Sequence, residues 1–139
     1  MTEIEESEYS LPSDTEIMQA IKENNEELLK DLCIPLGKMH ENWRFSQDVC
    51  VKLSDHGNEV IRSSALLGLS MTVMRHLKIE KNIVKPVLLR GRNDQSEVVR
   101  NAAETAINDI NSWMKWSIGQ AQKNKENEKR YEERKNKKS

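Results

Sequence analysis

An internal repeat constrains this chain of 139 residues more than any other feature. A motif of Glu, two β-branched residues and Arg occurs twice, followed each time by an alanine three positions after the arginine. The two copies are Glu59-Val60-Ile61-Arg62 with Ala65 and Glu97-Val98-Val99-Arg100 with Ala103. A two-helix unit with a period near 40 cannot bury its apolar face alone, so it must stack on its neighbours. The repeat therefore predicts an all-α stack of helix pairs.

The first helix is expected to begin after Ser13, because Ser13 and Glu16 have the spacing of a capping box. Apolar residues then follow at helical spacing through residue 32. The pair Asn24-Asn25 either lies on the solvent face of this helix or splits residues 14–34 into two short helices. Pro35 and Gly37 are expected to end the segment.

The remaining elements are predicted from apolar spacing and turn residues. Residues 38–44 are expected to form a connection carrying Trp43. Further helices are expected around 45–53, from 59, around 83–88 and through 114, with Gly119 as a C-cap. About five or six antiparallel helices result. The chain has only 5 Gly and 3 Pro and shows no sustained alternation of period two, which argues against a β fold.

The pattern predicts three regions. Residues 1–12 are expected to form a flexible acidic N-terminus, residues 13–118 the helical domain, and residues 119–139 a polar tail that is disordered or frayed. A binding role for the tail is the less favoured alternative.

Charge is unevenly distributed along the sequence. The net charge is -1, which argues against a general nucleic-acid binder. Residues 1–34, however, hold 10 acidic and 2 basic side chains. Such a segment is mostly a solvated surface, but it can also steer a basic partner.

The two cysteines, Cys33 and Cys50, are expected to be buried free thiols in a reducing compartment, with a disulfide as the less favoured alternative. The acidic N-terminus lacks the apolar core of a signal peptide. The most apolar window, residues 65–74, is shorter than a membrane span. We therefore expect a cytoplasmic protein with no membrane partner.

No motif for nucleotide binding, acyl transfer or metalloprotease chemistry occurs in the sequence. We predict no catalytic residue, metal, cofactor or small-molecule substrate. His56 and Glu59 have a spacing that metal ligands can use, but a solvated histidine near a helix start is favoured. The charged repeat residues, which invite catalytic interpretations, are expected to be structural: Asp55, Arg62, Asp94 and Arg100.

Residues 43–116 resemble the HEAT-repeat family. The better copy carries Pro86 in its first helix, the Asn93-Asp94 turn, the Val99-Arg100 pair and Ala103. The resemblance implies a right-handed α-α superhelix of antiparallel helix pairs whose second helices line a concave face. Residues 14–34 would then be a divergent N-terminal cap.

The three tryptophans are expected to lie in different environments. Trp113 follows Ile110 by three positions and is expected in the core, whereas Trp116 lies near the end of the helix. For Trp116, packing at the end of the stack is favoured over contact with a partner, although tryptophan is enriched at interface hot spots. Trp43 is a second candidate for partner contact.

Function is predicted from the general type of the chain. With its His40-Glu-Asn-Trp43 motif and repeat units, it resembles small HEAT-like immunity proteins found beside polymorphic toxins. This implies a non-enzymatic protein that binds and blocks a basic toxin domain encoded nearby. The candidate partner-binding residues are Glu23, Glu26, Glu27, Asp31, Trp43 and Trp116. The alternatives are a nucleic-acid-binding solenoid, similar to helical-repeat DNA glycosylases, or a subunit of a larger scaffold.

Overall fold

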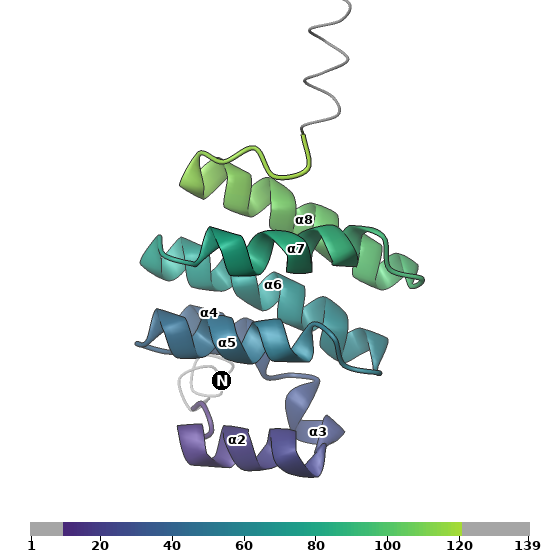
Figure 1. The fold of residues 1–139 in the computed structure, drawn as a ribbon. Helices are drawn as coiled ribbons and strands as arrows, with labels where there is room; N and C mark the ends of the chain where they lie inside the picture. Colours follow the sequence, from purple (N-terminus) through teal and green to yellow (C-terminus); the bar gives the residue numbers. More distant parts are fainter. Residues whose placement is uncertain (1–9, 121–139) are drawn as a thin grey trace, which may run out of the picture.

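The computed structural model describes residues 10–120 and is entirely helical over that range (Figure 1). Seven helices occur there, and their bounds are α2 (Asp14–Glu23), α3 (Glu26–Leu29), α4 (Cys33–Met39), α5 (Trp43–Leu53), α6 (Glu59–His76), α7 (Lys81–Arg92) and α8 (Glu97–Met114). The predicted all-α fold is confirmed. The count exceeds five or six because three short helices, α2, α3 and α4, occur between residues 14 and 39.

The helices form three stacked pairs. Helix α5 pairs with α6 and α7 pairs with α8, and we call α2, α3 and α4 together the first pair. Within it, α2 packs on α3, whereas α4 packs on α5 and α6 of the next pair. Of the second helices α4, α6 and α8, the central α6 packs on both of the others. In Figure 1 the turns within pairs lie on the right and the loops between pairs on the left. We call these two sides the turn edge (24–25, 54–58, 93–96) and the loop edge (40–42, 77–80, 115–118).

Polar side chains begin most of these helices. The predicted capping box is confirmed, because Ser13 accepts from the Glu16 amide while the Glu16 carboxylate accepts from the Ser13 amide. Four further caps accept from first-turn amides: Asn25, Asn42, Asn58 and Ser96. These bonds satisfy amide donors that have no partner within the helix.

Of the two alternatives left open for Asn24-Asn25, the structure has the break between two helices. The predicted end at Pro35 and Gly37 is wrong. Asn24 has φ 53, a left-handed conformation that ends α2. Pro35 and Gly37 both lie inside α4. A proline in the first turn of a helix costs little, because its missing N–H would have no intrahelical partner there. The connection predicted at residues 38–44 spans only 40–42, because α4 ends at Met39 and α5 begins at Trp43.

Two glycines set the separation of α4 and α6. A Cβ placed on Gly68 would lie 2.6 Å from the Cys33 carbonyl oxygen, and one on Gly37 would collide with the Gly68 carbonyl oxygen. The two backbones are therefore in direct contact. Any side chain at either position would push the second helices apart.

The two cysteines are buried free thiols, as predicted. They meet beside Gly68, where a Cβ would lie 2.7 Å from the Cys50 sulfur and 2.9 Å from the Cys33 Cβ. A side-chain hydrogen bond with Cys33 and burial together raise the pKa of the Cys50 thiol. Both effects favour the protonated, unreactive form.

The chain folds back at the end of the stack. Asn111 donates to the Ile118 carbonyl at 3.0 Å and accepts from the Ile118 amide at 2.9 Å. This holds Ile118 against the core and packs half-buried Trp116 on it. Lys115, in a left-handed conformation, is the C-cap of α8, so the expectation that Gly119 caps this helix is wrong.

The expectation that Trp113 is a core residue is also wrong. Its side chain is 51% exposed, while Ile110 is fully buried. The last turn of α8 presents Ile110 and Asn111 to the interior, and Trp113 lies beyond this buried stripe.

Two sequence predictions fall largely outside the described residues, namely the flexible N-terminus (1–12) and the polar tail (119–139). Among the helices that are described, none has both the length and the apolar content that a bilayer crossing requires.

Ala103 tests the packing of the repeat. Ala103 is fully buried. Helices α7 and α8 are close there, because a Cβ added to Gly91 would lie 3.1 Å from the Cβ of Ala103. We expect Ala103→Leu to lower the free energy of unfolding by about 1–3 kcal/mol through overpacking. Thermal unfolding measures this loss. Asn108→Leu, at an exposed position of the same helix, is the control and should change the melting temperature little.

The thiols test the packing at Gly68. We expect Cys33 and Cys50 to react very slowly with a thiol reagent such as Ellman's reagent in the native protein, because both are fully buried. Both should react at once after denaturation with guanidinium. Rapid labelling of either thiol in the native state would contradict this packing.

Candidate protein-binding surface

The turn edge repeats one local structure in the second and third pairs. The His56 Nδ1 accepts from the Asn58 amide at 2.9 Å, and the Asp94 Oδ1 accepts from the Ser96 amide at 2.9 Å. The structural counterpart of Asp94 is therefore His56, which precedes it by the same 38 positions by which Glu59 precedes Glu97. Asp55 is an additional residue, because the turn before α6 is one residue longer than the turn before α8.

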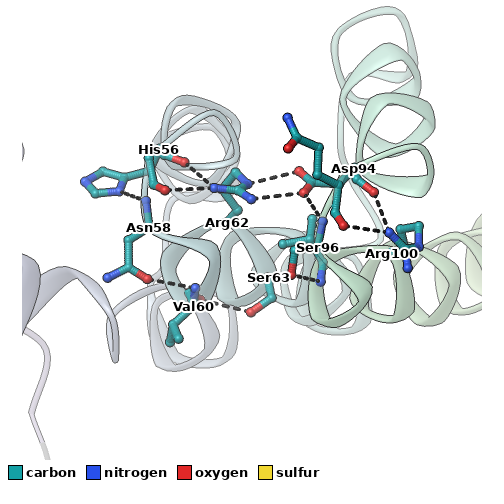
Figure 2. Close-up of polar contacts among 11 residues, drawn as sticks. His56, Asn58, Val60, Arg62, Ser63, Asp94, Ser96 and Arg100 are labelled. Carbon is teal, nitrogen blue, oxygen red and sulfur yellow. Dashed lines mark hydrogen bonds and ion pairs between the residues drawn. The ribbon is translucent and has the colours of Figure 1, made fainter.

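The repeat arginines fold back onto these turns (Figure 2). Arg62 Nη1 donates to the His56 and Gly57 carbonyls, both at 3.0 Å. Arg100 Nη1 donates in the same way to the carbonyls of Asp94 and Gln95, at 2.8 and 2.9 Å. Each arginine thus satisfies two backbone carbonyl acceptors of its own turn and ties that turn to the helix that follows it.

Arg62 also joins the second pair to the third. Its Nε and Nη2 donate to the two carboxylate oxygens of Asp94 at 3.0 and 2.9 Å (Figure 2). Both side chains are less than one-fifth exposed. The hydrogen bonds from Arg62 lower the pKa of Asp94 and raise the pKa of Arg62. A two-point contact of this kind fixes orientation as well as distance.

Histidines hold the first pair at both of its ends. At the turn edge, the second ring nitrogen of His56 bonds Asn24 Oδ1, and Asn58 donates to Glu26 at 3.0 Å. At the loop edge, His40 Nε2 lies 2.8 Å from Asp14 Oδ1. Both ring nitrogens of His56 are therefore engaged within the chain. The described residues contain no group of three or more His, Cys, Asp or Glu side chains that could hold a metal.

Four predicted partner-binding residues lie together at the turn edge. All four are exposed, and they lie close together along the chain: Glu23 ends α2, Glu26 and Glu27 begin α3, and Asp31 lies two residues before α4. The Asn24–His56 and Glu26–Asn58 bonds bring the next turn beside them. That turn adds two exposed acids, Asp55 and Glu59. We call these six residues the acidic edge.

The acidic edge has few basic neighbours that could cancel its charge. Lys30 lies 3.5 Å from Glu27, Lys22 is exposed on α2, and exposed Arg90 lines a cavity together with Asp55. Arg62 interacts electrostatically with Glu59 and Asp55, but its guanidinium is already paired with Asp94. A net negative surface therefore remains at this end of the stack.

The two candidate tryptophans lie apart from the acidic edge. Trp43 begins α5 at the loop edge, half-buried, with the guanidinium of Arg44 5.0 Å from its ring. Trp116 follows α8 on the same side, with Lys81 5.1 Å from its ring. The Trp116 side chain is partly buried against the core. The six predicted residues thus form two groups on opposite edges.

Sequence analysis missed an apolar stripe on α6. Leu67, Met71 and Met74 lie at spacings of four and three residues, outside the buried set of Ile61, Ala65 and Leu69. The sequence could have indicated this stripe, because residues 59–76 carry apolar side chains on more than one side of a helix. A helix buried on one face only would carry polar residues at these positions.

A polar cavity of about 340 Å³ lies at the turn edge. Its lining includes Arg62, Asp94 and His56, whose side chains are bound to one another or to the backbone. Groups held in this way stabilise the stack and are poorly placed to act on a substrate.

Comparison with protein families, curated proteins and solved structures found no match to this chain.

Asp94→Asn tests the link between the second and third pairs. The variant keeps the shape and the acceptor for the Ser96 amide but loses the charge. We expect it to lower the free energy of unfolding at pH 7 by about 1–2 kcal/mol, because the pair is partly exposed to solvent.

The pH dependence of this loss follows from the lowered pKa of Asp94. In the wild type, the stabilisation is complete above the ordinary aspartate pKa, about 4, and disappears as pH falls through the lowered folded-state value. The difference between wild type and variant should therefore narrow on acidification. Urea denaturation at pH 7 and pH 3 measures it; an equal difference at both would contradict the assignment.

His56→Ala tests the attachment of the first pair. We expect faster hydrogen exchange in α2 and α3, because the variant loses the bond to Asn24 and the acceptor for the Asn58 amide. Exchange in α8 should not change. Asp55→Ala, at the neighbouring exposed position, is the control and should leave α2 and α3 protected.

Proposed function

We propose that this chain is a non-enzymatic protein-binding module of the HEAT-like type that binds and blocks a basic protein. As the particular case, we propose an immunity protein whose partner is a bacterial toxin domain encoded nearby. The observation that carries the proposal is the acidic edge, where six exposed carboxylates gather on two successive helix pairs.

The acidic edge is held in place by the fold. The hydrogen bonds of Asn24 with His56 and of Glu26 with Asn58 fix two turns relative to each other. A partner that meets this surface finds charges already positioned, so little ordering entropy is lost there on binding.

The charged residues at the turns also favour binding over catalysis. Arg62, Asp94, Arg100 and His56 invite catalytic interpretations, yet each is engaged in hydrogen bonds that tie turns or pairs together. Blocking a toxin requires only a stable complementary surface, which a rigid stack of helices provides.

The function is tested by association kinetics. We expect the chain to co-purify with the basic product of a neighbouring gene in a stoichiometric complex. Replacing Glu23, Glu26, Glu27 and Asp31 with their amides should slow association, measured by surface plasmon resonance, more than it speeds dissociation. The effect should shrink as salt rises, because exposed charges are screened.

A control with the same change in net charge replaces Glu3, Glu5, Glu6 and Glu8, which lie outside the described residues. We expect this variant to slow association less. If both variants slow association equally, net charge accounts for the effect, and the position of the acidic edge does not matter. Tighter binding to nucleic acid than to any neighbouring gene product would overturn the proposed function.

A further inference from the structure

A groove between α2 and α5 leaves apolar side chains of α2 open to solvent. Its volume is about 630 Å³, and its lining comes from α2 except for Lys52 of α5. Met18 is 49% exposed and Ile21 is partly buried there, whereas Ile17 and Ala20, on the adjacent side of α2, are buried. Covering the open side of α2 would remove further apolar surface from water and would therefore stabilise the fold.

The groove is also basic. Lys22 and Lys52 line it, and neither forms an ion pair with another residue in the range 10–120. The acid in its lining, Asp14, lies 2.8 Å from the His40 ring nitrogen and is engaged there. The two lysines therefore remain available to an acidic occupant.

The nine residues that precede the described range have the complementary chemistry. Residues 1–9 contain four glutamates, no basic side chain, and the apolar side chains of Ile4 and Tyr9. A second cavity beside α2, of about 370 Å³, is lined by Glu16 and Glu23 and would repel such a segment, since like charges brought together are unfavourable. Charge thus favours the basic groove over its acidic neighbour.

The segment begins where it can reach the groove. Leu11 packs against the core shortly before Asp14, which is the first residue of the groove's lining. From Asp14 to Lys22 the groove follows α2 for about 12 Å, at ~1.5 Å per residue. Ser10 lies at most ~14 Å from Asp14, and the extended chain between Ser10 and Ile4 spans up to ~20 Å. This length is enough to place Ile4 over the apolar part of the groove.

We infer that residues 1–9 bind the groove between α2 and α5 of their own molecule, as a strap across the first pair. Ile4 packs on Met18 and Ile21, and glutamates of the strap lie beside the two groove lysines. The apolar contact supplies most of the stabilisation, because exposed ion pairs contribute little. It offsets the entropy lost in ordering a segment whose composition alone predicts flexibility. The inference is independent of the proposed function, because it concerns contacts within one chain.

Methyl NMR on the full chain tests the contact. With isotope-labelled isoleucine and methionine methyl groups, we expect nuclear Overhauser effects from Ile4 to Met18 and Ile21. Absence of these cross-peaks would overturn the inference. In a mixture of two differently labelled chains, cross-peaks that arise only between molecules would overturn it in favour of a second copy.

Hydrogen exchange gives a second test with variants outside the described residues. Ile4→Gln should speed exchange in α2 severalfold, because the strap loses its apolar anchor. The matched control, Thr2→Gln, changes the same segment and should leave exchange in α2 as in wild type. Unchanged exchange in Ile4→Gln, or equal acceleration in both variants, would overturn the inference.

Charge reversal tests the groove lysines. Lys22→Glu with Lys52→Glu should weaken the cross-peaks between Ile4 and Met18, because the groove then repels the glutamates of the strap. The matched control, Lys38→Glu with Lys85→Glu, makes the same change in net charge at two exposed lysines away from the groove. It should leave the cross-peaks intact. Equal losses in both variants would contradict the assigned contact, and circular dichroism checks that both variants fold.

Discussion

The close contact of α4 and α6 is the constraint on which the rest of the structure depends. Gly37 and Gly68 bring these backbones together so tightly that neither position has room for a Cβ. Because α6 also packs on α5 and α8, its position sets the position of every later helix. The break between α3 and α4 does not disturb this contact, because only α4 packs on α6.

The turn edge follows from the same stacking. Once the second helices are parallel neighbours, their turns meet along one side, and the bonds from His56 to Asn24 and from Arg62 to Asp94 join successive pairs. These polar links are directional, so they specify the register of the stack in a way that apolar packing alone does not. The acidic edge is a product of this register.

The charges at the ends of the second helices α4, α6 and α8 have a simple origin. Acidic residues in the first turn and basic residues in the last turn favour each helix individually, because they complement its dipole. Glu59 and Arg75 do this in α6. Helix α4 has only the basic residue, Lys38, and α8 only the acidic residue, Glu97. Parallel stacking therefore places Glu97 and Glu59 at the same end of the stack, and Lys38 and Arg75 at the other. In the proposed complex, long-range charge would govern the rate of encounter more than the final affinity.

The sequence by itself determined the helices, the repeat and the buried alanines. Apolar spacing and the Ser13 capping box are local signals, and local signals specify helix positions. The sequence also grouped Glu23, Glu26, Glu27 and Asp31, because they are close along the chain. Tertiary structure decided the outcome wherever a neighbour mattered. Gly37 lies inside a helix because α6 packs there, and Trp113 is exposed because Ile110 and Asn111 take the interior side of α8. Residues on α4, α6 and α8 form one face only after stacking, because their distance along the chain carries no information about which helix packs on which.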